Sequence, residues 1–124
     1  MSTLAWPADW LRLRAPAGTE APCYWFLREI YRVVLGVGLP EGDMPPAVWT
    51  AQLTDAQGAP EWEQTAPEPF AVALLHDPEA GRWHLGVCVG DGTMLSCTHA
   101  GVLRIPLARV RRHVVGTFRY RRAG

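Results

Sequence analysis

The feature that most limits the folds open to this chain is a single amphipathic helix, with a cysteine at its start, followed by short strand-like segments. From Cys23 onward, apolar residues recur at the spacing of one helix face. The positions on this face are Phe26, Leu27, Ile30, Val33, Val34 and Val37. The pattern predicts one helix that carries Cys23 on its buried side.

The two ends of this helix are signalled unequally. We expect the helix to stop at Gly36 or Gly38, because glycine adopts the left-handed conformation of a helix cap. Two starts fit the sequence: Thr19 caps the helix, or Ala21 caps it weakly and Pro22 takes the first helical position. The second start places the cysteine nearer to the free backbone N–H groups of the terminus.

Strand-like runs dominate the chain after residue 69. The stretch 41–69 is rich in proline and is interpreted as irregular, with one short helix expected over Pro46 to Leu53. A helical turn is expected over Arg109 to His113. The expected strands are Phe70 to His76, Trp83 to Val89, Met94 to Cys97, Val102 to Ile105 and Val114 to Tyr120. One helix followed by about five short antiparallel strands predicts an α+β domain.

Length and composition narrow the class of protein. At 124 residues the chain is long enough for one domain, 1–124, with a core of its own. Its three cysteines have neither a disulfide nor a zinc-ligand spacing, so we expect reduced thiols and no metal. The N-terminus lacks a basic region followed by an apolar one, and no run approaches the roughly 20 apolar residues of a membrane span. We therefore expect no signal peptide and no membrane span.

The charged residues are unevenly distributed, although the formal net charge is zero. All the basic residues are arginines, and no acidic residue follows Asp91. The arginines beyond that point are Arg104, Arg109, Arg111, Arg112, Arg119, Arg121 and Arg122. We interpret them as a solvated face, with an acidic partner surface as the alternative. No helix or aromatic strand motif of a nucleic-acid-binding domain accompanies them, so we expect no nucleic-acid partner.

Cys23 and His84 are the candidate catalytic pair. The positive end of a helix lowers the pKa of a thiol and so supplies the reactive thiolate. A histidine held on a strand, as expected for His84, can act as the base. The alternative is that Cys23 is a small buried hydrophobe and His84 an ordinary sheet residue. Cys88 and Cys97 are interpreted as core or edge thiols.

The order of these elements resembles that of the NlpC-type cell-wall endopeptidases, which are small papain-like cysteine peptidases. The likeness is greatest to the branch found in phage tail tips and phage-like particles, and it covers most of the chain. The matching residues are Cys23, Leu27, Arg28, Tyr31, Leu35-Gly36, Leu39-Pro40, Trp83 to Val87, Gly90 to Gly92, Met94-Leu95, Gly101-Val102 and Val114 to Arg119.

The resemblance implies a papain-like fold in which the cysteine-bearing helix packs on a small antiparallel sheet. It implies Cys23 as the nucleophile and His84 as the base, with no cofactor. It also implies a polar residue twelve positions after the histidine that orients the imidazole, and Ser96 occupies that position. Relatives commonly carry His, Asn or Gln there. A serine hydroxyl can accept the ring N–H bond, but it reaches less far.

The residues around the nucleophile depart from the family pattern. The family usually has Asp-Cys-x-Gly, whereas this chain has Pro22, Cys23, Tyr24 and Trp25. A glycine close to a nucleophile makes room for the substrate backbone. The Trp25 indole that replaces it either closes the groove or turns away and packs.

The loop at Gly90 to Gly92 decides which residue faces His84. A two-residue turn sets His99 opposite His84. A three-residue loop with a bulge brings Ser96 to the face of His84 instead. The family spacing favours the three-residue loop, and His99 remains the reserve orienting residue.

Two functions follow from the resemblance. The first is a phage tail-tip hydrolase that cuts peptide bonds of bacterial peptidoglycan during envelope penetration, made in the host cytoplasm and carried on the virion tail. The second is a degenerate member of the same fold that serves as a structural tail-tip or baseplate protein. Partners would be the peptidoglycan peptide and other tail-tip or baseplate proteins.

Overall fold

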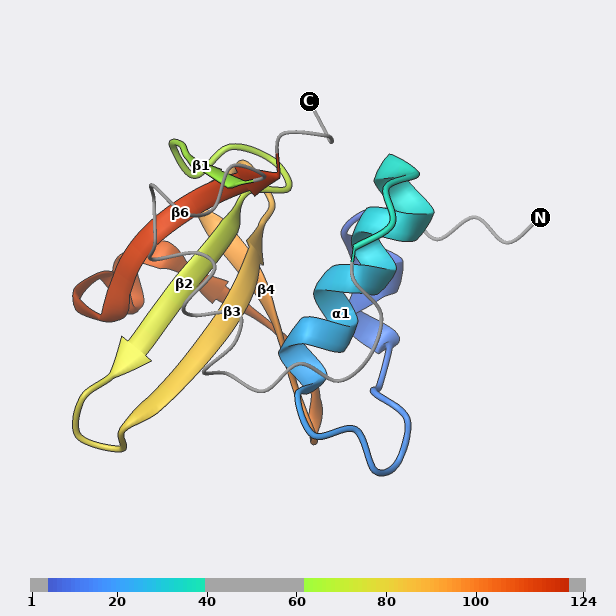
Figure 1. Ribbon diagram of the computed structural model, residues 1–124, viewed down its shortest axis with the longest axis horizontal. Helices are drawn as coiled ribbons and strands as arrows, with labels where there is room; N and C mark the ends of the chain where they lie inside the picture. Colours follow the sequence, from blue (N-terminus) through green and yellow to red (C-terminus); the bar gives the residue numbers. More distant parts are fainter. Residues whose placement is uncertain (1–4, 40–61, 121–124) are drawn as a thin grey trace.

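The protein has an α+β fold in which one short helix packs on a six-stranded antiparallel sheet (Figure 1). The structure is a computed structural model that describes residues 5–39 and 62–120. The short helix expected over Pro46 to Leu53 lies outside the described residues. The strands are β1 (Trp62–Gln64), β2 (Val72–Asp77), β3 (Arg82–Cys88), β4 (Thr93–Thr98), β5 (Gly101–Pro106) and β6 (Val114–Tyr120).

The predicted helix forms as α1 (Pro22–Ile30) and continues as a wider π turn, Tyr31–Leu35. Ala21 is the N-cap, without a side-chain cap hydrogen bond, and Pro22 is the first helical residue. This is the second of the two predicted starts. The helix ends at Gly36, whose φ of 68° lies in the left-handed region. A residue with a Cβ adopts this conformation only at a cost, so the cap requires glycine.

The strands follow the order β1-β6-β2-β3-β4-β5 in the sheet. All five predicted strands form, and most of their ends differ by one or two residues from the predicted ends. The sheet gains a sixth strand, β1, in a stretch that the sequence predicts as irregular. Only three residues long, β1 pairs with the end of β6, where Trp62 lies opposite Tyr120. So short a strand has too few residues to show an alternating pattern.

The two faces of the sheet bury separate apolar clusters. On one face, Phe26 and Ile30 of α1 pack with residues that include Leu74, Leu85 and Leu95. Burying Ile30, which has no exposed surface, contributes about 1.5–3 kcal/mol. The other face carries a smaller cluster of Ala71, Ala73, Leu75, Cys88 and Met94. Alternate residues of each strand therefore point toward α1 and away from it.

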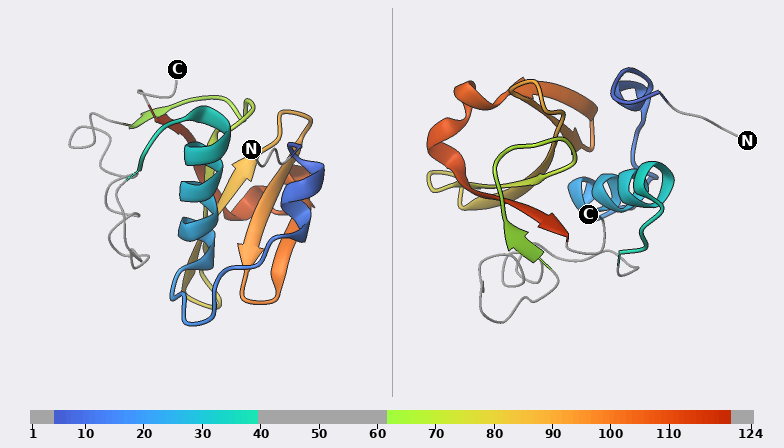
Figure 2. Two further views of the ribbon diagram at one scale, coloured as in Figure 1. Left: turned by 90° about the vertical axis from the view of Figure 1, so that its right-hand side faces the viewer. Right: turned by 90° about the horizontal axis from the view of Figure 1, so that it is seen from above.

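The segment before α1 is also ordered against the domain. It contains a 3-10 helix, η1 (Ala8–Arg12), that contacts β5. Trp10 of this helix is fully buried, and its ring meets that of Phe26 edge-on at 5.9 Å between centroids. Figure 2 shows η1 and α1 side by side along the same side of the sheet. The sequence does not predict η1, because five residues after a proline carry no readable period.

Among the described residues, no helix is long and apolar enough to cross a membrane.

Candidate active site

The structure joins His84 of β3 to Ser96 of β4 by a side-chain hydrogen bond between His84 Nε2 and Ser96 Oγ. Ser96 is only 2% exposed, and among the described residues it is the one buried polar side chain of the sheet core. The bond depends on the hairpin register: Val87 lies opposite Leu95, and the Val89 N–H donates to the Thr93 carbonyl, so that three residues form the loop. The predicted three-residue loop is therefore confirmed.

The histidine and the serine lie where β3 and β4 have separated. Within the described residues, backbone pairing between these strands covers only Val87 with Leu95 and Cys88 with Met94. Beyond that point β4 stays paired with β5 as far as Thr98. The His84–Ser96 hydrogen bond thus links two strand ends that the backbone ladder no longer joins.

Cys23 lies beside the same end of β4. It is the second residue of α1, 7% exposed, and α1 contacts both β3 and β4. Burial, and to a smaller extent the nearby Cys23 thiol, raise the pKa of the Cys97 thiol to about 11. Because Cys97 directly follows Ser96 on β4, the nucleophile candidate and the orienting residue are close along this strand.

Strand alternation places these side chains on different sides of β4. Cys97 belongs to the cluster that packs against α1, together with Cys23. Ser96 and His84 alternate with that cluster and point toward the other face. A direct contact between Cys23 Sγ and the His84 ring remains a prediction.

Burial determines the protonation of the titratable groups in this region. It lowers the pKa of His84 below its ordinary value, so the imidazole is neutral near pH 7. A neutral imidazole is the form that accepts a proton. Burial raises the pKa of Cys88 to about 11, so this thiol and that of Cys97 stay protonated. Both are buried thiols of the core, as predicted.

The hydrogen bond engages the Nε2 atom of His84, so Nδ1 is the ring nitrogen that Ser96 does not occupy. When Ser96 Oγ accepts from the Nε2–H group, the proton resides on Nε2 and Nδ1 keeps its lone pair. His99, the reserve orienting residue, is exposed in the turn after β4. Of the two residues that the sequence left open, Ser96 is the one that meets the ring.

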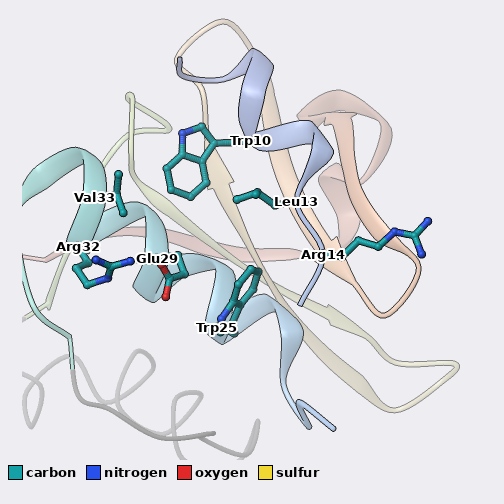
Figure 3. Close-up of a pocket in the computed structure, with 7 residues that line it drawn as sticks. All are labelled: Trp10, Leu13, Arg14, Trp25, Glu29, Arg32 and Val33. Carbon is teal, nitrogen blue, oxygen red and sulfur yellow. Dashed lines mark hydrogen bonds and ion pairs between the residues drawn. The ribbon is translucent and has the colours of Figure 1, made fainter. Parts of the chain in front are cut away.

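Trp25 lies in a hollow between α1 and the segment that precedes it (Figure 3). The hollow has a volume of about 470 Å³ and includes Trp10, Leu13 and Glu29 among its lining residues. Cys23 is not one of those residues. The indole packs against the apolar cluster that includes α1 and lines this hollow, and an open groove at Cys23 stays a prediction.

Two features of this region are absent from the sequence predictions. One is the closeness of Cys23 and Cys97, and the other is the packing of the segment before α1 around Trp25. Within 5–39 and 62–120, no group of three His, Cys, Asp or Glu residues could hold a metal ion.

Comparison with protein-family models and with curated protein sequences finds no match to this chain.

Proposed function

We propose that this protein is a cysteine peptidase that hydrolyses peptide bonds of bacterial peptidoglycan as a component of a phage tail tip. The observation that carries the proposal is the hydrogen bond between His84 and Ser96, two residues twelve positions apart. It joins the base to its orienting residue at the strand ends nearest to the start of α1. The NlpC-type order of elements supports the substrate class and the tail location.

In this mechanism Cys23 Sγ attacks the carbonyl carbon of the scissile peptide bond. His84 Nδ1 takes the thiol proton and passes it to the leaving amine as the C–N bond breaks. Backbone N–H groups at the start of α1 stabilise the oxyanion of the tetrahedral intermediate. Water then attacks the thioester, with His84 again as the base, and releases the acid and the Cys23 thiol.

Ser96 contributes by holding the ring. A neutral histidine has two tautomers, and only the one protonated on Nε2 offers Nδ1 as a base. In the proposed mechanism the Ser96 hydroxyl accepts from Nε2, which leaves Nδ1 as the base. Since Ser96 is buried, bulk water does not compete for this bond.

A second candidate function is a structural tail-tip or baseplate protein without hydrolytic activity. The observation that favours it is the burial of Cys23, which at 7% exposure leaves little room for a carbonyl to approach the sulfur. The residue before it, Pro22, is also buried, where the family pattern has an aspartate.

Purified peptidoglycan distinguishes the two. The protein should release soluble muropeptides, and Cys23→Ala should abolish release while its circular dichroism spectrum stays that of the wild type. Cys88→Ala, which removes a buried thiol from the opposite face of the sheet, is the matched control and should retain activity. A folded wild type that releases nothing would refute the peptidase and leave the structural protein.

A further inference from the structure

An exposed cluster of arginines lies on the segment between β5 and β6. Arg109 ends one short 3-10 helix, η3 (Leu107–Arg109), and Arg111 and Arg112 belong to the next, η4 (Arg111–His113). All three side chains are exposed. Within the described residues, none of the three forms an ion pair. By contrast, Arg104 pairs with Asp91 and Arg119 with Glu63.

An open apolar groove of about 380 Å³ adjoins these arginines. Its walls come from η3, β6 and the turn before β2, with Arg111 at the rim. The residues that line it are Gln64, Pro67, Leu107, Ala108, Arg111, Val114, Gly116 and Thr117. A groove of this size accommodates one or two apolar side chains.

The arginines and the groove lie on the far side of the sheet from α1. Figures 1 and 2 show the segment between β5 and β6 at the opposite end of the molecule from the helix. Leu107 and Val110 of this segment pack under the sheet on the cluster that contains Leu75 and Met94. A ligand bound there would not touch Cys23 or Trp25.

We propose that this surface binds an acidic segment of a partner protein, with an apolar side chain of the segment in the groove. Three exposed guanidinium groups that form no ion pair with any described residue, in a stretch with no acidic residue after Asp91, supply a positive field that a carboxylate-rich chain complements. The apolar lining of the groove adds a hydrophobic contact to the electrostatic attraction of the arginines.

The same features disfavour a nucleic acid. Among the described residues, no aromatic side chain lines the groove to stack a base.

The test uses the whole chain and three labelled probes. The first is a short peptide of Glu and Asp with one Phe and one Leu, the second its Gln and Asn isostere, and the third an oligothymidylate of equal charge to the acidic peptide. Binding is measured by fluorescence anisotropy in about 50 mM salt, where exposed charges are weakly screened. The binding site is mapped by amide chemical shifts.

The acidic peptide should bind tightest and shift the amides of Ala108, Val114 and Thr117. Replacing both Arg109 and Arg112 with Gln should weaken it about fivefold to tenfold. Arg14→Gln, which removes an exposed arginine beside α1 on the other side of the sheet, is the matched control and should change nothing.

Several results would overturn the proposal. They are equal binding of the Gln and Asn isostere, tighter binding of the oligothymidylate, equal loss in Arg14→Gln, and shifts confined to residues outside the groove. Absence of any binding by the acidic peptide would do so as well. Muropeptide release by the Arg109 and Arg112 variant is expected to equal that of the wild type.

Discussion

Replacing Ser96 with alanine tests the contact on which the candidate site depends. The substitution removes the hydroxyl that meets His84 Nε2 and leaves one ring nitrogen without its partner. A buried polar group left unpaired costs about 1–3 kcal/mol. The His84 ring is only half-buried, so the lower part of that range, about 1–2 kcal/mol, applies. In a domain of this size the loss corresponds to a fall in Tm of roughly 3–8 °C.

A double-mutant cycle separates this hydrogen bond from general packing. Urea unfolding is measured for the wild type, Ser96→Ala, His84→Phe and the double variant. In the His84→Phe background the serine hydroxyl already lacks its partner, so Ser96→Ala should be nearly neutral. The coupling between the two positions should therefore be about 1 kcal/mol or more.

The same variant has a catalytic consequence. Without Ser96 the imidazole is free to take the other tautomer, so muropeptide release should fall at least about tenfold with the fold intact. Equal costs of Ser96→Ala in both His84 backgrounds would refute the hydrogen bond. Unchanged release, with the coupling present, would limit Ser96 to a structural role.

Three further outcomes are expected. Iodoacetamide should alkylate Cys23 before Cys88, because burial raises the pKa of the Cys88 thiol to about 11. Mass spectrometry measures the two alkylation rates, and equal rates would contradict a reactive Cys23 thiolate. Burial lowers the pKa of His84 in the folded protein, so the folded state favours the neutral ring. The free energy of unfolding should therefore be highest above about pH 6.5 and should fall as the pH drops below that value. Urea unfolding between about pH 7 and pH 5 should show this loss, and His84→Gln should flatten it; parallel curves would argue against it. Gly36→Ala should lower the free energy of unfolding by about 1–2 kcal/mol, because the φ of Gly36 is 68°. Gly38→Ala, where a Cβ would meet open space, should lower it less. Equal losses would count against Gly36 as the helix cap.

Local patterns in the sequence were sufficient for the elements whose signal repeats over several residues. The apolar stripe after Cys23 predicted α1, because a helix face repeats every three to four residues. Glycine in the left-handed region marked its end at Gly36. Five strands followed from short alternating or apolar runs between turns. The local pattern at Gly90 to Gly92 left two loop lengths open, and a shift of one residue in a hairpin exchanges the two faces. The spacing of the family that the chain resembles, rather than the local pattern, favoured the loop that pairs His84 with Ser96.

The tertiary structure decided what depends on segments far apart in the chain. β1 pairs with β6, Trp10 is buried against α1, and Trp25 lines a hollow together with the segment before α1. Each of these contacts joins residues that share no local sequence pattern. The separation of β3 from β4 and the closeness of Cys23 to Cys97 belong to the same class. Sequence periodicity tells which face of an element is apolar, but not which other element covers it. That choice is made by the packing of the whole domain, where side chains must fill the space between elements with few voids.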